Sequence, residues 1–354
     1  MSCNISEHKQ KFLHELPKCE HHVHVEGTLS PELLFSLAKR NNITLPDHFP
    51  GSVELCNERY DNFADLQDFL DHYYIGMSVL INEQDFEDLA YEYFKKAKSD
   101  GLHHTEVFFD PQGHVERGIS IDTVVNGLNK ACKKAEEELK ISTKLIMCLL
   151  RHLPVPNCIE TIKSAHKYYN DGTIHGLGLD SSEKPFPPEL FESCYKLVKE
   201  NHPNALLTAH AGEEADPIFI TNSLDLLNVT RIDHGVQSHR DDELLKRLAD
   251  NKIMLSVCPL SNVKLQVVND VKELPIRKFL EFNVPFSINS DDPAYFGGYI
   301  LDNYIAIEDR FQLTGEEWVK IAKNGVYGSF IDDKRKEEIY NAIDEVYNKY
   351  KDLI

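Results

Sequence analysis

The sequence has no apolar run near the ~20 residues that a membrane-spanning helix needs. It also lacks an N-terminal segment in which a charged start precedes an apolar stretch. Basic residues are few, because 38 Lys and Arg stand against 58 Asp and Glu and give a net charge of −20. Such a charge argues against binding nucleic acid by phosphate neutralisation. We therefore expect a soluble protein with no nucleic-acid or membrane partner. We expect it in the cytoplasm, with the nucleus as an alternative location.

Paired cysteine motifs are absent as well. The eight cysteines are scattered without a C-x-x-C pair, and Cys148 and Cys258 lie in apolar stretches that suit a small buried side chain. We expect reduced, mostly structural thiols. No internal repeat, low-complexity run or linker divides the chain, so residues 1–354 are expected to form a single domain.

Eight apolar runs of strand length follow one another along the chain, with helix-like segments between them. The runs are 19–25, 103–110, 143–152, 174–180, 205–213, 231–235, 253–261 and 284–292. The clearest helical segments are 120–140, 189–201, 241–251 and 276–282, with apolar residues spaced three and four apart. Repeated strand–helix units predict a parallel sheet. Eight units favour an α/β fold of the closed (β/α)₈ TIM-barrel type over an open doubly wound sheet.

A long helical insertion follows the first predicted strand, at residues 44–98. Its sequence holds two amphipathic stretches, "NFADLQDFLDHYYIGMSVL" and "EQDFEDLAYEYFKKAKSD". Loops after barrel strands emerge at the C-terminal face, where barrel active sites lie. We interpret the insertion as a lid over a substrate, with peripheral packing as the alternative.

Polar residues interrupt the apolar runs at several strand ends. His22 and His24 are two apart and therefore share one face of a strand. Further candidates are His210 and Glu213 in "TAHAGEE", Asp233 and His234 in "RIDHG", and Asp291 and Asp292 in "SINSDDP". A lone H-x-H pair is weak support for a metal site, but strand ends of one barrel converge on one mouth.

The nitrogen-rich set His22, His24 and His210, completed by a carboxylate from the end of the eighth strand, suits one Zn²⁺ per chain. Fe²⁺ and Mn²⁺ remain possible with the same ligands. A bound zinc ion lowers the pKa of its water toward ~7 and so favours hydrolysis. His234 could take the proton of that water, and Glu213 could give a proton to the substrate. Asp233 is more simply a carboxylate that orients an imidazole.

The motifs "HVHVEG", "HAGE", "DHG" and "SDDP", in this order over nearly the whole chain, resemble the adenosine and adenine deaminase family of metal-dependent hydrolases. Longer stretches, "GLGLDSSEKPFPPELF" and "NSDDPAYFGGYILDNY", are similar to the fungal adenine-specific branch. The resemblance implies four zinc ligands, His22, His24, His210 and Asp291. It also implies Glu213 as proton donor to purine nitrogen 1, and His234 as the base acting on the water. It also implies Asp292 as the contact to nitrogen 7, and hydrolytic deamination of adenine to hypoxanthine and ammonia in purine salvage.

Two departures from the adenosine-specific pattern bear on the substrate. Glu26 replaces the aspartate that meets the ribose in that branch, and its extra methylene could fill the space of a ribose. The fourth strand ends in "LDSSEKPF", where Ser181, Ser182 or Glu183 could contact the purine; we take Ser182 as the candidate.

Several alternatives stay open, namely deamination of adenosine, a barrel that only binds a purine, and a metal hydrolase of amides or phosphoesters. N6-substituted adenines are further candidate substrates. The cytosine-type zinc deaminases are excluded, because the P-C-x-x-C half of their signature is missing. The sequence leaves the oligomeric state undetermined.

Overall fold

The computed structural model describes residues 5–64 and 66–354. Eight parallel strands form one sheet in chain order, each hydrogen-bonded to the next. They are β1 Lys18–His24, β2 Leu102–Phe109, β3 Ser142–Leu150, β4 Gly176–Asp180, β5 Leu206–Ala211, β6 Arg231–His234, β7 Met254–Val257 and β8 Phe286–Ile288.

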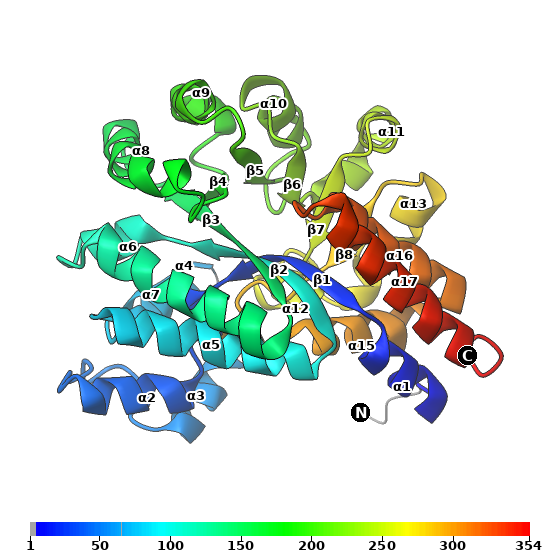
Figure 1. Cartoon of the computed structure of the whole chain (residues 1–354), viewed down its shortest axis with the longest axis horizontal. Coiled ribbons are helices and arrows are strands. Elements are labelled where there is room, and N and C mark those ends of the chain that lie inside the picture. Colours follow the sequence, from blue (N-terminus) through cyan, green and yellow to red (C-terminus); the bar gives the residue numbers. More distant parts are fainter. Residues whose placement is uncertain (1–4, 65) are drawn as a thin grey trace.

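The sheet closes on itself through β1 and the segment that follows β8. The amide of His24 donates to the carbonyl of Asp291 at 3.0 Å, and the amide of Asp291 donates to the carbonyl of His22 at 3.0 Å. A parallel bridge pairs Val23 with Asp291. Together with the helices around the strands (Figure 1), this confirms the predicted (β/α)₈ barrel.

The wall helices follow the strands in order. They are α6 Pro111–Val115, α7 Ile121–Lys134, α8 Val155–Asn170, α9 Glu192–Asn201, α10 Ile218–Leu226, α11 Asp242–Asp250, α12 Pro259–Lys264 and α13 Ile276–Glu281. The C-terminal helices are α14 Pro293–Phe296, α15 Ile300–Phe311, α16 Gly315–Gly328 and α17 Asp333–Tyr350, and α1 Glu7–Glu15 precedes β1. Side-chain caps start several of them, as where the Ser120 hydroxyl accepts from the amide of Thr123. Figure 1 shows α1 and α17 near each other, beside the two chain ends.

The predicted seventh and eighth strands exceed the observed ones most. The seventh ends at Val257 because Pro259 occupies the first turn of α12, where its fixed φ favours a helix. The eighth ends at Ile288, and the polar residues after it leave the strand to border the barrel mouth. An apolar run by itself does not separate a buried strand from the helix that follows it.

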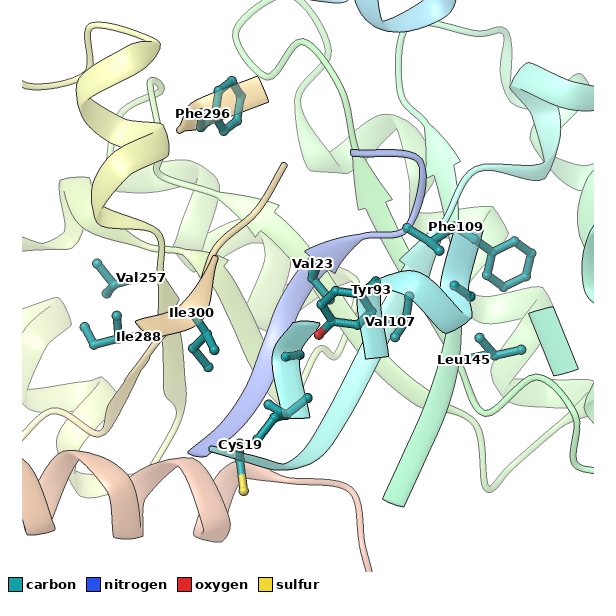
Figure 2. Close-up of a cluster of buried hydrophobic side chains, with 14 of the residues drawn as sticks. Cys19, Val23, Tyr93, Val107, Phe109, Leu145, Val257, Ile288, Phe296 and Ile300 are labelled. Atoms are coloured by element: carbon teal, nitrogen blue, oxygen red, sulfur yellow. The ribbon is translucent and has the colours of Figure 1, made fainter. Parts of the chain in front are cut away.

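Alternation along the strands separates the wall core from the barrel interior. Figure 2 shows Val23, Val107 and Tyr93 of the large apolar core close together on the wall side. Phe108 and two β3 residues, Ile146 and Cys148, form a separate cluster inside the barrel. The seven cysteines among the described residues are free and buried, as expected for structural thiols.

The long segment after β1 forms four helices, α2 Pro31–Arg40, α3 Val53–Tyr60, α4 Leu66–Met77 and α5 Glu83–Ser99. The last of them, α5, packs against α7 and the sheet, and the Tyr93 hydroxyl donates to the Glu20 carboxylate at 2.6 Å. By contrast, α4 borders the mouth of the barrel. Within the described part of the chain, no helix is long and apolar enough to cross a membrane.

Candidate active site

A cavity with an empty volume of about 510 Å³, part of it open to solvent, lies at the C-terminal mouth of the barrel. Its lining combines acidic and imidazole side chains from the strand ends with apolar side chains of α4 and neighbouring loops. The polar lining residues are His24, Asp110, Asp180, Ser181, His210, Glu213, His234, Asp291 and Asp292. The apolar and aromatic ones are Phe69, Leu70, Tyr73, Tyr74, Leu150 and Leu265.

The four predicted metal ligands converge beside this cavity. The Asp291 Oδ1 atom lies 3.3 Å from His22 Nε2 and 3.5 Å from His24 Nε2. The two Nε2 atoms of His24 and His210 are 3.1 Å apart. All four side chains are buried. His22 Nε2 has no hydrogen-bond partner among the described residues, so a buried lone pair points at the space between the ligands.

Three imidazoles and a carboxylate are a donor set that suits Zn²⁺, and the orphaned His22 nitrogen gives such an ion a reason to bind. Burial lowers the pKa of His24 to about 4, which keeps this imidazole neutral and able to coordinate. Burial opposes ionisation of Asp291, but the neighbouring histidines, His22 foremost, outweigh it and hold the pKa of its carboxyl well below the usual range. The residues present therefore fit the metal.

A hydroxyl and two carboxylates lie near the outer ring nitrogens of these imidazoles. The Ser256 hydroxyl lies 3.0 Å from His22 Nδ1 and donates to Asp233 Oδ1 at 3.1 Å. The other oxygen of Asp233, Oδ2, lies 3.6 Å from His210 Nδ1. Asp180 Oδ2 lies 3.4 Å from His24 Nδ1. Asp233 thus lies where the sequence predicted an orienting carboxylate, on the sides of the rings away from the metal site.

Glu213 faces the cavity from the loop after β5. Burial raises the pKa of its carboxyl well above the ordinary value, and the negative charges of Asp291, Glu183 and Glu214 raise it further. Its Oε1 atom has no hydrogen-bond partner among the described residues. A carboxyl group with a raised pKa and one unpartnered oxygen in a cavity is suited to donate a proton to a bound ligand.

His234 ends β6 with a positive φ of 65°, which turns its side chain into the mouth. Its Nε2 atom lies 3.4 Å from Glu213 Oε2 and 3.7 Å from Asp291 Oδ2. Burial lowers the pKa of His234 well below its usual value, and nearby His22 adds to this effect. The imidazole is therefore neutral and can accept a proton.

Asp292 lines the cavity and has a raised pKa, caused first by burial and then by Asp291. Its Oδ1 atom has no partner in the described part of the chain. Gly27 lies directly against it, because a Cβ on Gly27 would be 1.9 Å from that oxygen. The glycine of "HVEG" therefore leaves room for a carboxyl group that is free to bind a ligand.

The structure brings together all the predicted metal and catalytic residues and Asp292; of these, only His22 does not line the cavity, and it lies 3.3 Å from Asp291. Glu26 and Ser182 also lie outside the lining. The fully buried Glu26 carboxylate accepts from His114 Nε2 at 2.8 Å and from the amide of Asp110 at 3.1 Å. In the fourth-strand loop it is Ser181 that lines the cavity, with a φ of 73°. Contact of Glu26 or Ser182 with a substrate stays a prediction.

Several lining residues were missed by the sequence reasoning. Asp110 directly follows β2 and Asp180 ends β4, and the same signal, a carboxylate closing an apolar run, could have singled them out. Burial raises the pKa of Asp110 well above its usual value, with Asp180 the next largest cause. Tyr73 and Tyr74 of α4 had no local signal beyond amphipathicity.

Comparisons with known proteins agree with this geometry. The adenosine deaminase family model matches residues 17–346. The chain is 67% identical over 345 residues to an adenine deaminase of Candida albicans, covering 98% of this chain and 97% of that protein. It is 59% identical over 341 residues to an adenine deaminase of Saccharomyces cerevisiae, covering 96% of this chain and 98% of that one.

A solved structure of an adenine deaminase from Arthrobacter aurescens superimposes with a TM-score of 0.89 at 39% sequence identity. The match covers 94% of this chain and 99% of the bacterial one. The sequence motifs, the barrel and the cluster at its mouth agree with these likenesses, and the chain belongs to the adenosine deaminase family of hydrolytic enzymes.

Proposed function

We propose that this chain catalyses the zinc-dependent hydrolytic deamination of adenine to hypoxanthine and ammonia, as a step of purine salvage. The observation that carries the proposal is the placement of Glu213, His234 and Asp292 in one cavity beside the converging ligand atoms. His22, His24, His210 and Asp291 would hold one Zn²⁺ per chain. When bound, the ion supplies a nucleophile at neutral pH by lowering the pKa of a water molecule.

The side chains of this chain then move the protons. Glu213 protonates nitrogen 1 of adenine, which makes carbon 6 electrophilic. His234 accepts a proton from the attacking water, and a tetrahedral carbon 6 forms. His234 returns that proton to the amino group, which leaves as ammonia, while the new hydroxyl group of the substrate gives its proton back to Glu213. Adenine and water thus yield hypoxanthine and ammonia with both residues restored.

Asp292 orients the ring by donating its carboxyl proton to nitrogen 7, a role supported by its raised pKa and its unpartnered Oδ1. The aromatic side chains Tyr73 and Tyr74 of α4 lie over the same cavity, and closure of α4 as a lid would exclude water from the reacting atoms. A dry site strengthens each of these hydrogen bonds.

The free base is favoured over adenosine by the relatives, since the curated proteins at 50–67% identity are named adenine deaminases. The test is ammonia release by the purified, zinc-loaded protein, with kcat/KM compared for adenine and adenosine under one condition. A large preference for adenine is expected. Preference for adenosine would overturn the choice of substrate, and inactivity on both would overturn the proposed reaction.

A further inference from the structure

Glu183 makes an unusual set of contacts just outside the cavity. Its carboxylate accepts hydrogen bonds from four consecutive backbone N–H groups of the loop after β5. Three of them, the amides of Glu213, Glu214 and Ala215, bind Oε2 at 3.1, 2.9 and 3.0 Å, and the amide of Gly212 binds Oε1. The side chain is 3% exposed. Charge-assisted bonds to a buried carboxylate are stronger than bonds between neutral groups.

This loop has no sheet or helix to order its amides, so their hydrogen bonds must go elsewhere. The carbonyls of Gly212 and Glu213 accept from Gln237, through its backbone amide at 2.8 Å and its side chain at 3.2 Å. Gly212 itself has a φ of 68°, and a Cβ there would meet Ile220 Cδ1 at 2.5 Å. The donors of the loop thus depend on Glu183.

A buried arginine ties the same two loops together. Arg151 donates from Nε to the carbonyl of Phe186 at 2.9 Å and from its guanidinium to the carbonyl of His210 at 2.9 Å. These bonds join the loop of Glu183 to the strand end that precedes Glu213. The loop that carries Glu213 is therefore fixed from one side by an anion and from another by a cation.

We propose that Glu183 is a positioning residue that holds Glu213 in place for proton donation, and that it does not contact the purine. The inference rests on the proposed function for the role of Glu213. Glu183 is outside the cavity lining, and both of its oxygens are already engaged with backbone amides. A displacement of about 1 Å in a reacting group can cost ~10²-fold in rate, so loss of this anchor acts mainly on kcat.

The test compares Glu183→Gln with wild type and with the matched control Glu214→Gln. Glutamine has one acceptor oxygen. Its side-chain NH₂ group only donates, so at least one of the four backbone N–H groups would lose its acceptor. Glu214→Gln removes a negative charge from the same loop and keeps all four bonds. For Glu183→Gln we expect kcat for adenine to fall by ~10²-fold with KM changed by less than about 3-fold, at unchanged zinc content.

Glu183→Asp keeps the carboxylate but shortens the reach by one methylene, so it is expected to restore part of kcat. An equal fall of kcat in Glu214→Gln would show an effect of charge alone and overturn the proposal. A raised KM with normal kcat in Glu183→Gln would mean that Glu183 binds the base, which also overturns it. If Glu183→Gln does not fold, the test uses Glu183→Asp alone. A wild-type kcat in folded Glu183→Asp would then overturn the proposal.

Backbone hydrogen exchange separates this inference from the proposed function. In the zinc-loaded wild type the amides of residues 212–215 are expected to exchange slowly, and Glu183→Gln should speed them without any substrate present. Inactivity of the wild type on adenine with this exchange pattern would overturn the proposed function and leave the anchor in place. Equal exchange in both proteins would overturn the anchor.

Discussion

Glu213 combines two properties that a proton donor needs at neutral pH. Burial raises the pKa of its carboxyl group, and the acidic neighbours Asp291, Glu183 and Glu214 add to the shift. It also faces a neutral imidazole, because the pKa of His234 is lowered by burial. Two titratable groups whose environments push their pKa values apart are typical of an acid and base pair.

Replacement of Glu213 by glutamine removes the transferable proton at nearly constant shape. We expect kcat for adenine to fall by ~10²–10⁴-fold, with the melting temperature and zinc content unchanged. Steady-state kinetics and metal analysis of the same preparation check this. A variant that keeps most of its activity would contradict the assignment of Glu213 as the acid.

The same pKa shift predicts a pH profile. Glu213 acts in its protonated form, so kcat/KM should persist above the ordinary carboxyl range and then fall as rising pH passes the raised pKa. In acid, activity should fall because the metal ligands must be deprotonated to bind. A profile without an alkaline fall would contradict Glu213 as the acid.

At the level of elements, α4 borders the cavity, whereas α5 packs against α7 and the sheet. One face of α4 lines the cavity with Phe69, Leu70, Tyr73 and Tyr74. The same helix packs through Phe69 against Tyr295 and Phe296, at ring-centroid distances of 5.5 and 4.8 Å. A helix held at one side and facing a ligand at the other can move as a lid.

If α4 is a lid, a bound product should hold it closed. Backbone amides of α4 are expected to exchange with solvent several-fold more slowly in the presence of saturating hypoxanthine, as the helix opens less often. Hydrogen exchange followed by mass spectrometry checks this, with α17 on the barrel exterior as the internal control. Identical exchange of α4 with and without hypoxanthine would favour peripheral packing.

Across the whole molecule, the predicted metal ligands lie where the barrel closes. His22 and His24 come from β1, Asp291 from the segment after β8, and His210 from β5 across the mouth. An ion bound by all four residues would connect β1 and the segment after β8, where the barrel closes, with β5 across the mouth. Metal binding and fold stability should therefore be linked.

Removal of the metal with a chelator is expected to lower the melting temperature by several degrees and abolish deamination. Zn²⁺ at a thousandfold excess over its Kd would restore about 4 kcal/mol to the free energy of unfolding. Calorimetry of apo and reconstituted protein measures the shift, and elemental analysis should give one zinc per chain. A melting temperature that is the same with and without zinc would contradict the predicted ligand set.

The strand order, the barrel and the clustering of the predicted site residues followed from the sequence. Their signals are local or periodic: a two-residue spacing places His22 and His24 on one face, and carboxylates or histidines close apolar runs. In a closed parallel barrel all such strand ends meet at one mouth, so local order is enough to predict proximity. The end of strand seven was misplaced because its apolar run continues into α12, and that of strand eight because the prediction included the polar residues after Ile288.

Only the tertiary structure decided where Glu26, Glu183 and α4 act. The Glu26 carboxylate turns to His114 and the amide of Asp110, and Glu183 meets a loop about 30 positions further on. No periodicity encodes such contacts, because they depend on how loops of irregular backbone pack and which buried amides need an acceptor. The sequence by itself determined the fold and the set of reactive groups, whereas side-chain packing between loops decided which groups face the cavity and which hold them.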